Sequence, residues 1–130
     1  MREILFKGKT NAGEWVEGFY TLYANNRGVH PCILTGTGQG CVIPAFVIPE
    51  TVGQFTGLTD KNGKRIFEGD IVKFGDIIGI INYNTGCYCV KTNKPDWRSR
   101  NNPAIDIIIN EYPNEIEIIG NIHDNPELLK

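Results

Sequence analysis

Four cysteines have the greatest capacity for chemistry in this chain of 130 residues: Cys32, Cys41, Cys87 and Cys89. Zinc sites usually combine two Cys-x-x-Cys pairs, or one such pair with two closely spaced histidines. Here the cysteine spacings are C-x8-C and C-x-C, and the two histidines, His30 and His123, are far apart in the sequence. We therefore expect reduced thiols that hold no metal, with Cys87 and Cys89 packed on one face of a strand.

Three carboxylates, those of Asp60, Glu68 and Asp70, lie close together in the sequence. Paired carboxylates can perform acid–base chemistry or bind a cation. Turn formation is the alternative, because Asp60 precedes Asn62-Gly63 and Asp70 follows Gly69. A carboxylate in such a position accepts hydrogen bonds from nearby backbone N–H groups. We favour this structural role over a catalytic one.

Two further patterns resemble catalytic ones but lack a necessary part. Residues 35–40 (TGTGQG) are rich in glycine, yet a phosphate-binding Walker loop needs Gly-Lys-Ser/Thr at the start of a helix. His30 and Cys32 share a strand face at i, i+2 spacing, which is a common coincidence. Without a convergent set of residues, we expect no enzymatic activity, no catalytic residue and no cofactor.

The segment 91–103 (KTNKPDWRSRNNP) is the candidate binding loop, and its relevant side chains are Lys91, Lys94, Trp97, Arg98 and Arg100. A long irregular loop in a compact domain is often functional. Trp97 can stack on a base or an aromatic group while the guanidinium groups meet phosphate or carboxylate. Two alternatives remain open. Trp97 can fold back onto its own domain, or Arg98 and Arg100 can meet the acidic residues of segment 104–130, in the same or a neighbouring chain.

The elements that position these residues are strands. The chain contains 18 Ile and 7 Val but only 6 Leu and 4 Ala, and β-branched side chains favour strands over helices. The 15 Gly and 7 Pro divide the chain at short intervals. We expect strands near residues 3–7, 14–23, 29–34, 41–43, 46–48, 54–56, 71–74, 77–83, 87–92, 104–109 and 115–119.

Turn residues predict how these strands are connected. Asn84-Thr85-Gly86 indicates a short hairpin, and Asp124 or Asn125 is expected to cap a helical turn that starts at Pro126. Pro44, Pro49 and the stretch 51–57 interrupt the pattern. We therefore expect a mainly β protein with an N-terminal β-rich domain over residues 1–56 and a small β-barrel domain over residues 57–130.

Charge and hydropathy exclude several classes of protein. The 13 basic and 15 acidic residues give a net charge of −2, and 41% of the residues are apolar. This composition argues against a disordered chain and against a strongly basic nucleic-acid-binding face. Met1-Arg2-Glu3 leads straight into Ile4, with no apolar signal segment. We expect a cytoplasmic protein that does not enter a membrane.

Three segments resemble the YopX family. Residues 49–64 (PETVGQFTGLTDKNGK) and 66–72 (IFEGDIV) are similar to its central signature. Residues 6–9 (FKGK) and 13–18 (GEWVEG) resemble its opening motif, and residues 118–129 (IIGNIHDNPELL) resemble its ending. The resemblance implies an origin in phages and prophages of Gram-positive bacteria and a second half like a Src-homology-3 β-barrel. It implies no activity and no catalytic residues.

These observations predict a phage or prophage accessory protein that binds other proteins, including copies of itself. Self-association is expected because apolar side chains occupy both faces of segments 77–81 and 107–109, and a small barrel has one interior. Ile108 and Ile119 are candidates for the surface between copies. The alternative to self-association is a monomer in which the N-terminal domain packs against the second domain and covers them. The alternative is a nucleic-acid-binding small β-barrel that uses the Lys91–Arg100 loop.

Overall fold

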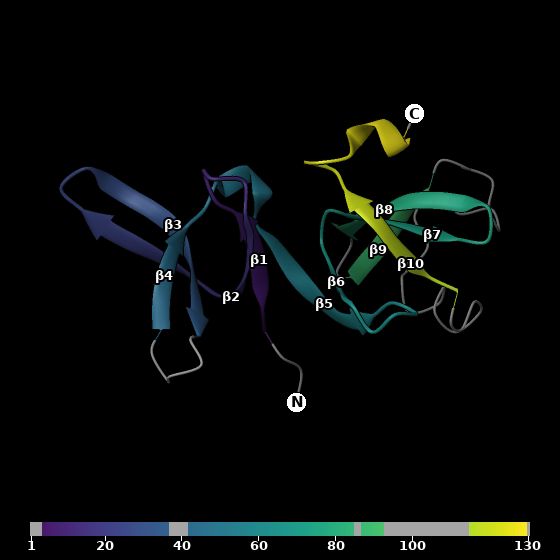
Figure 1. The fold of residues 1–130 in the computed structure, drawn as a ribbon, viewed down its shortest axis with the longest axis horizontal. Coiled ribbons are helices and arrows are strands. Elements are labelled where there is room, and N and C mark those ends of the chain that lie inside the picture. Colours follow the sequence, from purple (N-terminus) through teal and green to yellow (C-terminus); the bar gives the residue numbers. More distant parts are fainter. Residues whose placement is uncertain (1–3, 37–41, 85–86, 93–114, 130) are drawn as a thin grey trace. The chain divides into compact units, whose positions relative to one another are not determined.

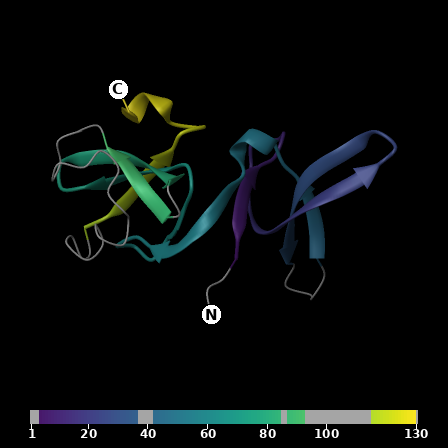
Figure 2. The same ribbon diagram turned by 180° about the vertical axis from the view of Figure 1, so that it is seen from behind.

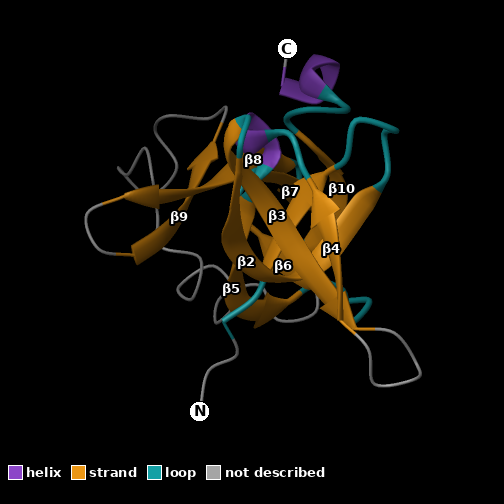
Figure 3. Ribbon diagram, turned by 90° about the vertical axis from the view of Figure 1, so that its left-hand side faces the viewer, coloured by secondary structure: helices purple, strands orange, loops and turns teal. Residues whose placement is uncertain are grey.

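The computed structural model describes residues 4–36, 42–84, 87–92 and 115–129. The chain divides into two compact units, Met1–Phe55 and Thr56–Lys130. Strands dominate both units, and the helical segments in the described residues are short 3-10 turns (Figure 3). None of the helices in these residues is long and apolar enough to cross a membrane. The prediction of a mainly β protein is therefore confirmed.

The N-terminal unit is an antiparallel sheet in which β2 and β3 form a long hairpin (Figures 1 and 2). Its strands follow the order β4-β3-β2-β1-β5. They are β1 (Phe6–Lys9), β2 (Trp15–Asn25), β3 (Gly28–Gly36), β4 (Val42–Phe46) and β5 (Gly53–Thr59). Strand β5 pairs with β1 through Gly53 and Gln54 and then continues into the second unit, where β6 (Arg65–Phe67) is its neighbour.

A threonine side chain fixes the irregular end of this unit. The 3-10 turn η1 (Pro49–Thr51) follows β4, and the Thr51 hydroxyl donates to the carbonyl of Ile48 at 2.6 Å. The same oxygen accepts the backbone N–H of Lys9 at 2.8 Å, and the N–H of Ile48 donates to the carbonyl of Lys9. Because Thr51 is buried, these bonds satisfy polar groups that would otherwise be costly to bury. They attach η1 to β1.

The second unit contains a four-stranded antiparallel sheet in the order β10-β7-β8-β9. Its strands are β7 (Asp70–Phe74), β8 (Ile77–Asn84), β9 (Cys87–Thr92) and β10 (Glu117–Asn121), and the turn η3 (Pro126–Leu129) follows. One apolar cluster forms its core. The fully buried members are Ile66, Val72, Phe74, Ile77, Ile81, Val90 and Ile116. No closed barrel is present in the described part of the unit, so the structure supports the sheet but not the barrel.

Most predicted strands are present, with shifted ends. The separate strands expected at 41–43 and 46–48 are one strand, β4, which contains Pro44. Proline is tolerated there because β4 is at the edge of its sheet. The last strand is displaced by two residues, to Glu117–Asn121, and the expected strand 104–109 lies outside the described residues. The helical turn begins at Pro126, as predicted.

The carboxylate of Asp60 is the centre of a turn. Its Oδ1 accepts the backbone N–H groups of Asn62 and Lys64, both at 2.9 Å, and Gly63 adopts a φ of +81°. Its Oδ2 accepts the N–H of Ile118 at 3.1 Å. Burial by itself raises the pKa of this carboxyl. The backbone hydrogen bonds from Ile118, Lys64 and Asn62, together with the charge of Lys64, outweigh burial and hold the pKa below its ordinary value.

The carboxylate of Asp70 also binds backbone. Its Oδ2 accepts the N–H of Phe67 at 2.8 Å, and the side chain is 1% exposed. Asp60 and Asp70 therefore have the structural role that the sequence predicted, because both close turns. Neither faces an open site at which a substrate could be protonated.

We expect Asp60→Asn to lower the free energy of unfolding by about 1–3 kcal/mol, because an amide cannot accept all three N–H groups. The folded-state pKa of Asp60 is depressed, so its contribution is present above the unfolded pKa of about 3.9 and is lost as the pH falls through the folded value. Urea titrations at several pH values from neutral to acidic measure this effect. The difference in unfolding free energy between wild type and Asp60→Asn should shrink as the pH falls.

The control for this experiment is Glu117→Gln. Glu117 lies near the same turn, and its carboxylate is 3.7 Å from the Lys61 ammonium in an exposed pair. Removal of such a pair changes stability by less than about 1 kcal/mol. Equal losses of unfolding free energy in Asp60→Asn and Glu117→Gln would contradict the role given to Asp60. So would a difference in unfolding free energy between wild type and Asp60→Asn that grows as the pH falls.

The amide of Asn82 on β8 predicts a stabilising substitution. Its Oδ1 is buried and has no hydrogen-bond partner, a feature shared by no other buried side-chain N or O atom in the described residues. An unsatisfied buried oxygen costs about 1–3 kcal/mol. We expect Asn82→Val, which suits a strand, to raise the free energy of unfolding by about 1 kcal/mol. Asn82→Asp, which places a charge there, should lower it. Thermal unfolding of the two variants measures both changes in stability. An Asn82→Val variant that is less stable than the wild type would show that the Asn82 Oδ1 has a hydrogen-bond partner in solution.

Candidate functional site

The candidate loop of the sequence analysis is described only at its first residue. Lys91 lies on β9, exposed and opposite Ile80 of β8. Lys94, Trp97, Arg98 and Arg100 lie outside the described residues. Of the two isoleucines expected between copies, Ile119 is half-buried on β10 and Ile108 lies outside the described residues. The structure does not test this loop, but it reveals a different surface.

That surface is the hairpin of β2 and β3 together with the edge strand β4. Three adjacent strands of one unit leave large apolar side chains between 39% and 62% exposed. These residues are Phe19, Tyr20, Leu22, Tyr23, Val29 and Phe46. We call this set the hairpin surface. Contiguous exposed apolar patches on folded proteins are typical of interaction sites, which makes the hairpin surface the candidate site.

On one face of the hairpin, three rings form a cluster. Tyr23 is opposite His30 in the β2–β3 register, and Phe46 is opposite Cys32 in the β3–β4 register. The Phe46 ring centroid is 5.7 Å from that of Tyr23 and 6.1 Å from that of His30, and both pairs are edge-to-face. This is a favourable geometry for aromatic pairs. Cys32 of this face is fully buried, whereas Tyr23 and Phe46 remain about half exposed.

The opposite face carries Tyr20, Leu22 and Val29. Tyr20 contacts the ring of Phe6 on β1, with centroids 5.4 Å apart, and is 39% exposed. Leu22 and Val29, farther along the hairpin, are 58% and 61% exposed. The outer half of the hairpin therefore presents apolar groups on both faces.

The tip of the hairpin is held by one amide. The Oδ1 of Asn25 accepts the backbone N–H of Arg27 at 2.8 Å and lies 3.2 Å from the Nε2 of His30. Gly28 completes the turn with a φ of +117°, which favours glycine. The turn positions Arg27 at the end of the strand pair and orients the His30 ring, so that the polar tip adjoins the aromatic cluster.

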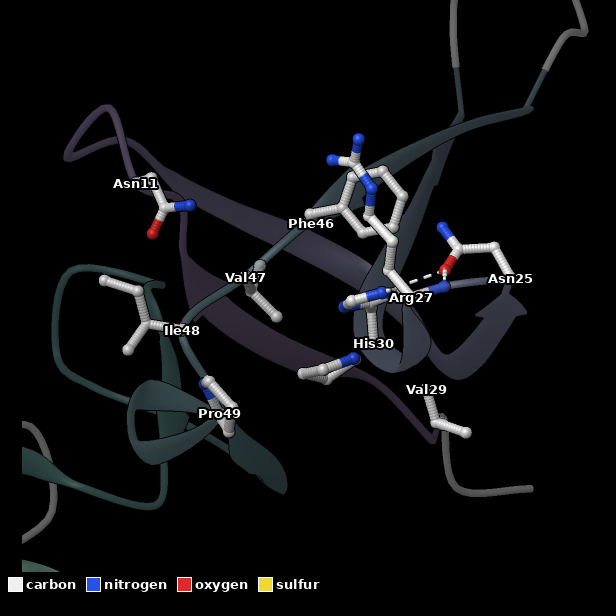
Figure 4. A pocket seen from close by; sticks show the side chains of 10 residues that line it. Asn11, Asn25, Arg27, Val29, His30, Phe46, Val47, Ile48 and Pro49 are labelled. Atoms are coloured by element: carbon white, nitrogen blue, oxygen red, sulfur yellow. Dashed lines mark hydrogen bonds between the residues drawn. The ribbon is translucent and has the colours of Figure 1, made fainter.

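A pocket of about 580 Å³ adjoins the tip within the same unit (Figure 4). Figure 4 shows Asn25, Arg27 and His30 at one end of it, and Asn11, Ile48 and Pro49 at the other. Its lining includes the cation of Arg27 and contains no carboxylate. The pocket can therefore accept an apolar or aromatic side chain that has an acidic or hydrogen-bonding group next to it.

The side chains of His30 and Cys32, which share a face of β3, lie in different surroundings. The His30 ring contacts Asn25 and Phe46, while the Cys32 thiol on the same strand is buried. No group of three or more His, Cys, Asp or Glu side chains in these residues could hold a metal ion.

The sequence contained a signal for this surface that our prediction did not use. Residues 19–23 (FYTLY) place large apolar groups at both odd and even positions of a strand, so one covered face cannot hide them all. We applied the same argument only to the isoleucine-rich segments. In segment 77–81, Ile77 and Ile81 are buried, and Ile78 and Ile80 are half-buried.

Comparisons with known proteins agree with the family resemblance. A crystal structure of protein EF1440 from Enterococcus faecalis is similar to this chain, with a TM-score of 0.59 and 25% sequence identity over 100% of both chains. No curated protein matches the sequence. Residues 6–130 match the family described as YopX protein. With nearly its whole length in that match, the chain belongs to the YopX family.

Proposed function

We propose that this protein is a non-enzymatic binding module that acts through protein–protein contacts, and that copies of it associate through the hairpin surface. The observation that carries the proposal is the exposure of six large apolar side chains on the adjacent strands β2, β3 and β4. Leaving such groups in water has a cost of about 25 cal/mol per Å², which a partner surface removes. Aromatic side chains are also enriched at protein interfaces.

A protein partner fits this surface better than a nucleic acid does. Phosphate recognition needs several basic groups on one face, and among the residues that line the pocket only Arg27 carries a full positive charge. The segment 1–55 contains four basic and four acidic residues, so it has no excess charge to attract a polyanion. The aromatic and aliphatic groups of the hairpin surface suit the largely apolar centre of a protein–protein interface.

Family membership adds two parts to the proposal. The second unit is proposed to be a Src-homology-3-like barrel, supported by its four-stranded antiparallel sheet and by the resemblance of its sequence. The protein is proposed to act in the cytoplasm of a bacterial cell as a phage or prophage accessory protein.

The proposal predicts self-association in solution. Light scattering after size exclusion should give a multiple of the chain mass of 14.5 kDa at tens of micromolar protein. Leu22→Glu alters one face of the hairpin and Phe46→Glu the other. Loss of one buried Leu or Phe is worth about 1.5–3 kcal/mol, so at least one of the two should weaken association by about tenfold or more.

Tyr83→Glu is the matched control, because Tyr83 lies in the second unit and is 57% exposed, against 58% for Leu22. It should leave the mass unchanged. Circular dichroism checks that all variants fold. A monomeric wild type would refute self-association. If Tyr83→Glu lowered the mass and neither hairpin variant did, the contact between copies would not lie on the hairpin surface.

The alternative of nucleic-acid binding through the Lys91–Arg100 loop has its own test. Single-stranded DNA or RNA should shift in a gel at low salt, and the shift should weaken as salt rises. Trp97→Ala should then weaken binding by about 1–3 kcal/mol, the range for one stacked base. An absence of binding near about 50 mM salt would exclude this alternative, since electrostatic attraction is strong there.

A further inference from the structure

The thiols of Cys87 and Cys89 on β9 are in direct contact. Their Sγ atoms are 3.5 Å apart, and the Cys89 thiol also lies 3.8 Å from the carbonyl oxygen of Cys87. Cys87 is exposed, whereas Cys89 is 4% exposed. The pair thus combines one thiol that dissolved reagents can reach with a second thiol that only its neighbour can readily reach.

From this contact we propose that Cys87 and Cys89 form a reversible dithiol–disulfide site, whose co-reactant is a low-molecular-weight disulfide. The Cys87 thiolate attacks one sulfur of that disulfide, the S–S bond breaks, and one small thiol leaves with a proton. The Cys89 thiolate then attacks the Cys87 sulfur of the mixed disulfide and releases the second small thiol. Two protein thiols are oxidised to one disulfide, and one small disulfide is reduced to two thiols.

Strand geometry makes this bond reversible. Residues i and i+2 of a strand have Cα atoms about 6.6–6.8 Å apart, at the upper limit of about 6.8 Å for a disulfide. Closing the bond therefore requires β9 to shorten between the two cysteines, and a disulfide held under strain is easily reduced. In the described sheet, β9 pairs on one side only, with β8. It can therefore shorten with the loss of fewer interstrand hydrogen bonds than a central strand would lose.

The other described cysteine lacks these features. Cys32 lies in the N-terminal unit, is 1% exposed and has no second thiol within contact in the described residues. Because the proposed site is in the second unit, it stands independently of the hairpin surface, and either proposal can fail without the other.

The test is thiol counting on the native full-length chain, first reduced, then incubated with oxidised glutathione and alkylated. Mass spectrometry of the wild type should show one bond between residues 87 and 89, no retained glutathione, and full reversal by excess reduced glutathione. Cys89→Ala should retain one glutathione on Cys87, because the second thiol is missing. In Cys87→Ala, Cys89 should react at least tenfold more slowly than Cys87, because it is buried.

A variant with both Cys32→Ser and Cys41→Ser serves as the control and should oxidise like the wild type. Circular dichroism before the reaction checks that each variant is folded. Glutathione that stays on Cys87 in the wild type, a disulfide that maps to Cys32 or Cys41, or a folded wild type that does not react would each overturn the proposal.

Discussion

A β-strand has two faces, and the chain of a small unit can rarely cover both of them with its own side chains. This constraint governs the N-terminal unit, because β2 and β3 carry apolar groups at odd and even positions alike. Ile33 on one face and Cys32 on the other are buried near the base of the hairpin. Farther out, Leu22 and Tyr23 point to opposite sides and both remain exposed. The candidate surface is therefore a direct consequence of strand geometry acting on the sequence.

Three polar residues of the segment that resembles the family signature serve the fold. The carboxylates of Asp60 and Asp70 and the hydroxyl of Thr51 all accept backbone N–H groups. Asp60 joins its turn to Ile118, which is 58 residues later in the chain. A group already bound to backbone donors and excluded from water is a poor candidate for proton transfer to a substrate.

The sequence was most informative where local chemistry decides the structure. Pro126, preceded by Asp124 and Asn125 as alternative caps, predicted the start of the last turn, and the β-branched segments predicted β7, β8 and β9 closely. Element boundaries failed where tertiary position matters. Pro44 suggested an interruption but lies within β4, because an edge strand tolerates a missing donor. Residues 19–23 signalled apolar groups on both faces of a strand, but which of them stay exposed depends on the neighbouring strands. The spacing of Cys87 and Cys89 predicted a shared strand face, but the exposure of one thiol and the burial of the other depend on what packs around β9.

The edges of the sheets limit how a partner could dock on the N-terminal unit. Addition of a strand to β4 would need a regular row of N–H donors, and Pro44 at the middle of that strand supplies none. Docking on the faces of the hairpin does not need backbone N–H donors, because the exposed groups there are side chains. Contact through Tyr23 and Phe46 on one face, or Leu22 and Val29 on the other, buries apolar area without extending the hydrogen-bonded ladder. For the association proposed above, this edge therefore favours packing of faces over addition of a strand.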